Sequence, residues 1–168
     1  DSAMYPSPYY IPKSLKTIII NGENMNIDLH NQITIEKIVF NDSVKNINST
    51  MKGCSSLKTV EMADSVETII NNAFAGCISL ENLKLSNNLK TIGQYAFDSC
   101  KALKKVVLPD SLTVMSPELF RNCESLETVI IGKNIEEIQV NVFSGCKNLV
   151  SVQFKDESKL KTLGSSSF

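Results

Sequence analysis

The 168-residue sequence contains no tryptophan, one histidine and one arginine, and its formal net charge is −1 at pH 7. Because lysines and acidic residues are spread along the chain, the charge balance argues against an electrostatic surface for nucleic acid or for an anionic membrane. No apolar run approaches the roughly 18 residues that a membrane-spanning helix requires. We therefore expect no nucleic-acid partner and no insertion of this chain into a membrane.

Motifs that carry catalysis are missing as well. The only histidine, His30, is remote from every cysteine, and the sequence has no phosphate-binding loop, no HExxH motif and no Cys-x-x-Cys pair. We expect His30 to lie on the solvated surface of a loop. The sequence therefore predicts no enzyme, no cofactor and no metal site.

What the chain does contain is a repeat. Its five cysteines lie at constant intervals of 23 residues, at Cys54, Cys77, Cys100, Cys123 and Cys146. Self-similarity at a period of this length is typical of a solenoid, in which each unit packs only against its neighbours. A residue that recurs in every unit is expected to stabilise the stack rather than to take part in a reaction.

Apolar and aromatic residues follow the same period. Each unit closes on an aromatic residue, and these are Phe74, Phe97, Phe120, Phe143 and Phe168, the last unit being two residues longer than the others. Leu83 and Leu85 flank Lys84, which predicts a strand with both leucines on one face and parallel pairing between the strands of successive units. Burial within one unit does not offset the ordering of 23 residues, so a lone unit cannot fold and stacking is required.

A tight turn is expected between the aromatic residue and the cysteine of each unit. The residue before the cysteine is Gly53, Gly76, Ser99, Asn122 or Gly145. Glycine and asparagine tolerate the left-handed backbone region, so Ser99 is the exception in this column.

The cysteines are predicted to be buried free thiols that fill the interior. Stacked side chains in adjacent coils are parallel and about 4.8 Å apart, whereas a disulfide needs Cβ atoms that converge to about 3.8 Å. A straight column of thiols also does not converge on a metal ion. Columns in which charge alternates, such as Glu36, Lys58 and Glu81, are interpreted as ladders that stabilise the stack.

The unit resembles the BspA-like, or Treponema-type, leucine-rich repeat, whose 23-residue unit contains Ala-Phe-x-x-Cys. Residues 73–77 and 96–100 match this motif, and the resemblance covers about residues 35–168. It implies a leucine-rich-repeat solenoid, mostly β. The expected architecture is a right-handed superhelix with a parallel β-sheet on its concave face and short helical or 3-10 turns on its convex side.

The expected organisation is an N-terminal arm or partial cap at residues 1–13, followed by the leucine-rich-repeat domain at 14–168. About two degenerate repeats would occupy residues 14–52, and regular repeats would follow at 53–75, 76–98, 99–121, 122–144 and 145–168. The N-terminal register stays open, because Leu15, Ile18 and Ile20 fit the opening of a unit whereas residues 11–15 fit the middle of one. Residues 21–34 fit neither and are expected to form an irregular loop.

Recognition is expected on the strand face that points away from the core. The candidate binding residues are Glu61, Lys84, Lys105, Val107, Thr128, Ile130 and Gln153. Val107 and Ile130 form an apolar pair of the kind that can mark an interaction site. The alternative interpretation is that β-branched residues are there because they favour strands.

The resemblance implies a non-catalytic protein-binding module of a cell-surface or secreted protein from a host-associated microbe. Adhesion through the concave sheet to a host extracellular-matrix protein, a host cell-surface protein or another cell is the function it favours. A structural spacer or scaffold with no ligand of its own is the alternative. Because the last unit stops at Phe168 without a polar cap, self-association through the C-terminal coil is also expected.

Overall fold

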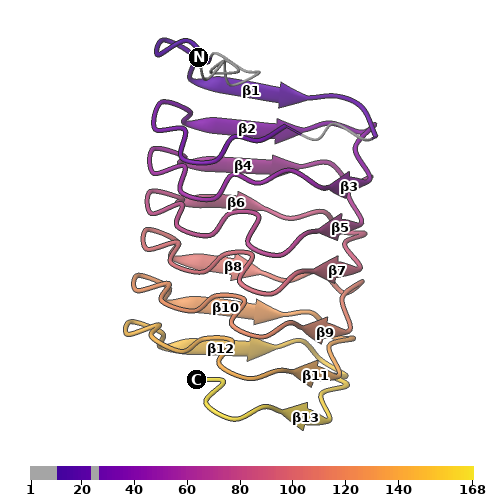
Figure 1. Cartoon of the computed structure of the whole chain (residues 1–168). Coiled ribbons are helices and arrows are strands. Elements are labelled where there is room, and N and C mark those ends of the chain that lie inside the picture. Colours follow the sequence, from indigo (N-terminus) through magenta and orange to yellow (C-terminus); the bar gives the residue numbers. More distant parts are fainter. Residues whose placement is uncertain (1–10, 24–26) are drawn as a thin grey trace, which may run out of the picture.

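The computed structural model describes residues 11–23 and 27–168, so most of the expected N-terminal arm lies outside the described residues. Figure 1 shows a stack of coils in which β1 and β13 lie at opposite ends. One strand of each coil belongs to a column of longer strands. These are β1 (Thr17–Ile20), β2 (Lys37–Phe40), β4 (Thr59–Met62), β6 (Asn82–Lys84), β8 (Lys105–Val107), β10 (Thr128–Ile131) and β12 (Ser151–Phe154).

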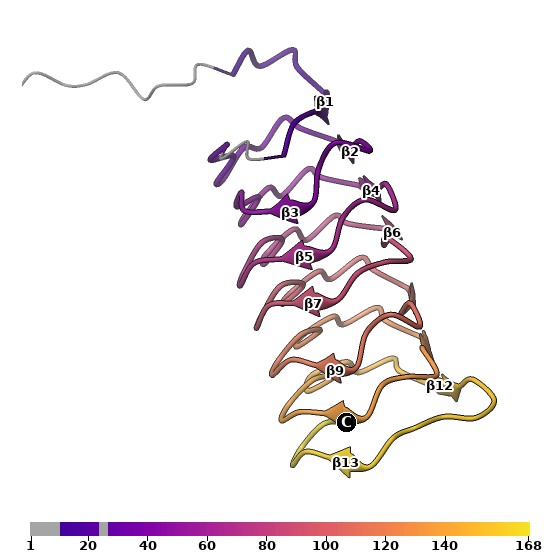
Figure 2. The same ribbon diagram turned by 90° about the vertical axis from the view of Figure 1, so that its right-hand side faces the viewer.

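A second column contains two-residue strands. These are β3 (Asn46–Ile47), β5 (Thr68–Ile69), β7 (Thr91–Ile92), β9 (Val114–Met115), β11 (Glu137–Ile138) and β13 (Thr162–Leu163). Figure 2, viewed from the side of this column, shows that the two columns form opposite walls of the stack. All pairing is parallel, and every pair joins neighbouring coils. The solenoid with a parallel sheet predicted from the sequence is confirmed.

Strand pairing also decides the N-terminal register. β1 pairs with β2 so that Ile18 lies opposite Ile38, and β2 pairs with β4 so that Ile38 lies opposite Val60. Ile18 therefore occupies the first inward position of a long strand. Of the two registers that the sequence leaves open, the one that places Leu15, Ile18 and Ile20 at the opening of a unit is correct.

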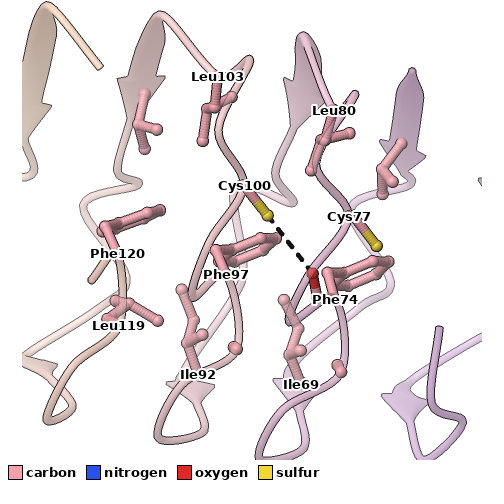
Figure 3. Close-up of a cluster of buried hydrophobic side chains, with 14 of the residues drawn as sticks. Ile69, Phe74, Cys77, Leu80, Ile92, Phe97, Cys100, Leu103, Leu119 and Phe120 are labelled. Carbon is pink, nitrogen blue, oxygen red and sulfur yellow. Dashed lines mark hydrogen bonds between the residues drawn. The ribbon is translucent and has the colours of Figure 1, made fainter. Parts of the chain in front are cut away.

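The core is a continuous column of apolar side chains between the two walls. The phenylalanines that close the units stack on one another, with ring centroids 5.3 Å apart for Phe74 and Phe97 and 5.5 Å apart for Phe97 and Phe120. Figure 3 shows these rings in register beside Cys77 and Cys100. Both the rings and these thiols are fully buried. The 23-residue repeat thus packs each of these side chains against the equivalent side chain of the neighbouring coil.

The cysteines are free, as predicted, and four of the five are buried. Each thiol also donates a hydrogen bond to a backbone carbonyl of the preceding coil, as in the 3.4 Å contact from Cys100 Sγ to the oxygen of Phe74. Cys77 makes the corresponding bond to Met51 at 3.2 Å. Cys146 is only half-buried because it belongs to the last coil of the stack.

The turns that contain the aromatic residues are not helical, contrary to the helical or 3-10 turns expected on the convex side. Within residues 11–23 and 27–168 no α-helix or 3-10 helix is present. Alternate N–H groups are committed to the next coil, since Phe74 donates to the oxygen of Ala96 and Gly76 to that of Asp98, both at 2.8 Å. Positive φ angles at Asn72 and Gly76 interrupt the turn further, so consecutive helical hydrogen bonds cannot form.

Candidate protein-binding surface

The predicted binding residues all lie on the outward face of the long strands, and none is buried. Lys84, Lys105, Val107 and Gln153 are exposed, whereas Glu61, Thr128 and Ile130 are half-buried. Val107 has the largest exposed fraction of the apolar residues in this set, at 48%. The inward neighbours Val106 and Val129 are fully buried, so the period-two alternation of a strand separates this surface from the core.

The structure divides these residues into two groups. Val107, Ile130 and Gln153 lie side by side on β8, β10 and β12. Glu61 lies beside Lys84 on β4 and β6. The two groups are separated because β6 and β8, although they belong to adjacent coils, do not pair.

This interruption is a seam in the long-strand sheet that the sequence reasoning missed. Most Cα pairs between β6 and β8 are more than 8 Å apart, whereas paired parallel strands lie about 4.8 Å apart. Among the described residues no backbone hydrogen bond joins the two strands. The same break separates β7 from β9 in the second column, so both breaks lie between the same two successive coils.

Two prolines lie in the coil on the C-terminal side of the seam. After β2, β4 and β12 a backbone N–H donates to the preceding coil, as Ala63 does to Phe40 at 2.9 Å, whereas Ser86 and Gly132 at the same position of their units make no such bond. Pro109 occupies this position after β8 and has no N–H to donate. Pro117 follows β9 at the position where Gln94 donates its N–H to the side chain of Asn71. Neither proline can therefore donate a backbone N–H to the coil before it, although the oxygen of Pro117 accepts from Tyr95 at 3.3 Å.

The aromatic turns remain joined across the seam. Phe97 donates its N–H to the oxygen of Leu119 at 3.1 Å, and Ser99 donates to that of Arg121 at 2.7 Å. The two halves of the stack are thus held together at the aromatic turns and by the hydroxyls of Ser111 and Ser116, which donate to the backbone oxygens of Leu89 and Ile92, while β6 and β8 and likewise β7 and β9 remain unpaired.

A groove of about 580 Å³ lies over the seam and is lined by residues of β4, β6 and β8. Leu83, whose counterparts Val60 and Val106 are fully buried, is only half-buried here and contributes to the groove. Lys84, Lys105 and Val107 line it as well. Four residues of the groove, Glu61, Lys84, Lys105 and Val107, were predicted only as positions on a continuous sheet, and Leu83 was predicted as core. The sequence signal for the seam was the occurrence of two prolines in one unit, residues 99–121.

Most charged columns form ion pairs between neighbouring coils. Glu36 lies 3.1 Å from both Lys16 and Lys58, which confirms the beginning of the predicted ladder. The ladder ends at Lys58, because among the described residues Glu81 makes no ion pair with Lys58 in the paired coil before it or with Lys104 across the seam.

Lysines next to the groove also lack partners. Lys84 and Lys105 form no ion pair with any described residue, whereas Glu61 on the same face is paired with Lys37 at 2.7 Å. Unpaired cations beside an exposed valine give this part of the surface both apolar contact and charge for an incoming partner.

Burial keeps these thiols in their protonated form. Burial raises the pKa of the Cys54 thiol to about 11, and it raises the pKa values of Cys77 and Cys100 as well. Because the thiolate is the nucleophile and the metal ligand, these protonated thiols serve packing and hydrogen bonding. Within the described part of the chain, no three histidine, cysteine or acidic side chains are grouped so as to hold a metal ion.

The described residues also include no helix with the length and hydropathy needed to cross a bilayer.

No match to a curated protein was found. The structure is similar to the crystal structure of the leucine-rich repeat protein TpLRR of T. pallidum, with 25% sequence identity and a TM-score of 0.79 over 92% of this chain and 75% of that chain.

Two further solved structures share the fold. A leucine-rich repeat protein of Bacteroides ovatus is 23% identical, with a TM-score of 0.64 over 92% of this chain and 46% of that chain. A leucine-rich cell surface protein of Faecalibacterium prausnitzii is 21% identical, with a TM-score of 0.66 over 91% of this chain and 48% of that chain. The chain thus spans about half the length of these two proteins.

The family is established by the repeats themselves. The model of the BspA type leucine rich repeat region matches residues 48–168 in six copies. The matched segment contains the column of five cysteines and the phenylalanines that stack in the core. The chain belongs to the BspA-type leucine-rich repeat family.

Proposed function

We propose that this chain is a non-catalytic protein-binding module that contacts its partner with the outward face of the long-strand sheet. The observation that carries the proposal is the combination, on one face, of an exposed Val107 and of two lysines, Lys84 and Lys105, that have no acidic partner in the described chain. A solenoid offers such a face to extended protein surfaces.

The partner we propose is a host extracellular-matrix or cell-surface protein, and the location is the cell surface or the extracellular medium. The description of the F. prausnitzii structure as a cell surface protein supports the location. The chain carries 17 basic and 18 acidic residues and has a formal net charge of −1. This balance supports a protein partner rather than a nucleic acid.

Lysine footprinting tests this function. The protein is acetylated at limiting reagent with and without each member of a panel of purified extracellular-matrix proteins. We expect at least one member to shield Lys84 and Lys105, on the outward face, and to leave Lys90 and Lys161, which directly precede β7 and β13 of the second column, as reactive as in the free protein. A structural spacer would show unchanged reactivity at all four lysines with every member of the panel, and this result would refute the proposal.

The C-terminal end of the stack offers a second contact. Val150 is 84% exposed, and Phe154, Leu163 and Phe168 are also exposed. We propose that two copies associate through this end, since side chains of this size gain from burial. Sedimentation velocity over a hundredfold concentration range tests this proposal. Replacing Val150 and Phe154 with aspartate should abolish any dimer, and a wild-type monomer at the highest concentration would contradict it.

A further inference from the structure

The seam presents unpaired backbone on both of its walls. Neighbouring residues of a parallel strand hydrogen-bond to opposite neighbours. Asn82 donates its N–H to Lys58, away from the seam, and Leu108 donates to Ile130, also away from it. The backbone groups of Leu83 on β6 and those of Lys105 and Val107 on β8 consequently face the seam.

We propose that an extended, acidic segment of a partner protein adds as a strand between β6 and β8. The proposal rests on the protein-binding function above and specifies the form and the charge of the partner. Strand addition satisfies free edge groups with main-chain hydrogen bonds, and an unpaired edge is a template for it. Here the incoming strand would find such an edge on each side.

The width of the seam fits this occupant. A strand paired on both sides would hold β6 and β8 about 9.6 Å apart, which is twice the spacing between neighbouring strands. Most of their Cα pairs are already more than 8 Å apart. The two halves are joined before the strands by the hydrogen bond from Ala102 to Ile78 at 3.1 Å, at the aromatic turns, and after the strands by the bonds from the hydroxyls of Ser111 and Ser116 to Leu89 and Ile92.

Charge decides which segment fits. Lys84, Lys104 and Lys105 line grooves at the seam and have no ion-pair partner among the described residues. Among the carboxylates that line these two grooves, Glu81 alone also lacks an ion-pair partner in the described chain. Asp110, by contrast, is held by Lys155 at 2.8 Å. Three free cations against one free anion favour a partner segment with acidic side chains.

Pro109 supplies no donor at the seam. It has no N–H to give to the coil before it, and it is buried. Replacing it with alanine would supply an N–H where Ala63 has one, and would favour closure of the seam.

Amide exchange measured by NMR tests the seam first. In the free protein we expect the amide protons of Lys105 and Val107 to exchange at least about a hundredfold faster than those of Thr128 and Ile130, which occupy the same positions in the paired strand β10. Equal protection of the two pairs would show that the seam is closed in solution and would overturn the proposal.

Peptide binding tests the occupant. The probes are the blocked, fluorescein-labelled peptides EVEVEV, KVKVKV and EVEPEV, the last lacking one central N–H. We expect EVEVEV to bind about tenfold or more tightly than either control and to slow the exchange of the Lys105 and Val107 amide protons. Failure of EVEVEV to bind at about 1 mM, or equal binding of all three peptides, would refute strand addition.

Two variants provide controls for the peptide test. Joint replacement of the exposed Lys84 and Lys105 with glutamate leaves the core intact and should reverse the preference, so that KVKVKV binds more tightly than EVEVEV. Pro109→Ala should weaken EVEVEV about tenfold through closure of the seam. An unchanged preference in the charge-reversed variant would show that the peptide binds elsewhere.

The outcomes separate this proposal from the broader function. Lysine footprints from a matrix protein together with no peptide binding would leave the outward face as the binding surface and refute strand addition alone. Protection of Lys105 and Val107 by EVEVEV without any matrix-protein footprint would support the seam and refute the proposed partner class.

Discussion

Left-handed backbone recurs at two positions of the repeat, and one of them lies immediately before the cysteine. Gly53, Gly76 and Gly145 have φ angles of 75°, 74° and 79°, and Ser99 and Asn122 adopt 59° and 57°. The sequence reasoning expected this turn and noted Ser99 as the exception. The structure shows that Ser99 adopts the same left-handed conformation as the glycines. The packing of the repeat therefore fixes the backbone conformation at this position, and the serine adopts it at a cost in conformational energy.

Exchanging residues between two of these turns should change stability in opposite directions. We expect Ser99→Gly to stabilise the fold and Gly76→Ser to destabilise it, each by about 1 kcal/mol, since a side chain at positive φ is strained. A Cβ at Gly76 would meet nothing closer than the backbone of Gly53 at 3.6 Å, so φ strain alone decides the sign. Urea denaturation of both variants measures the effect, and two changes of the same sign would contradict it.

Thiol reactivity should follow burial. In urea without a reducing agent all five cysteines should react with iodoacetamide, because none is in a disulfide. In the native protein Cys146, which is half-buried, should react first, and Cys77 and Cys100 should resist because burial raises their pKa values. Mass spectrometry counts the adducts. Fewer than five in urea would indicate a disulfide.

At the scale of the elements, the sequence predicted the strands well and their pairing incompletely. Leu83, Lys84 and Leu85 alternate as expected of a strand, and period-two alternation is a local property that the sequence displays directly. The seam is a break in backbone pairing between coils, which the pattern of side chains does not contain, and the sequence marks it only by Pro109 and Pro117 in one unit. The outward residues were therefore predicted correctly as positions, whereas the groove between β6 and β8 was not.

The aromatic column is the element that spans the seam, and a cavity in it should be costly. Phe120 is fully buried between Phe97 at 5.5 Å and Phe143 at 5.9 Å. We expect Phe120→Ala to destabilise the fold by about 3–5 kcal/mol. Phe168→Ala is the matched control and should cost much less, because Phe168 is 56% exposed. Similar urea midpoints for the two variants would refute a structural role for the continuous column.

At the scale of the whole molecule, ion pairs between coils should make stability depend on pH. Hydrogen bonds from Lys16 and Lys58 lower the pKa of Glu36, and a hydrogen bond from Lys90 lowers the pKa of Glu67. Because a carboxyl with a lowered pKa releases its proton more readily when folded, its contribution is complete above the unfolded value of 4.5 and is lost as the pH falls through the folded value.

The expected result is a modest decrease in the urea midpoint between about pH 6 and about pH 3. The decrease should be smaller in 1 M salt, since these groups are exposed and salt screens them. Replacing Glu36 and Glu67 with glutamine should reduce the slope. A midpoint that rises on acidification would contradict the assignment.

The central claim is that the outward face of the long-strand sheet binds a protein, and paired glutamate substitutions test it most directly. Val107→Glu with Ile130→Glu alters that face, whereas Val114→Glu with Val140→Glu places the same charges on exposed valines outside the long-strand sheet. Binding of wild type and both double variants to immobilised extracellular-matrix proteins is measured by surface plasmon resonance. We predict that the first double variant loses at least about tenfold in affinity and the second binds like wild type. Unchanged binding of the first double variant, or no binding by wild type, would contradict the account.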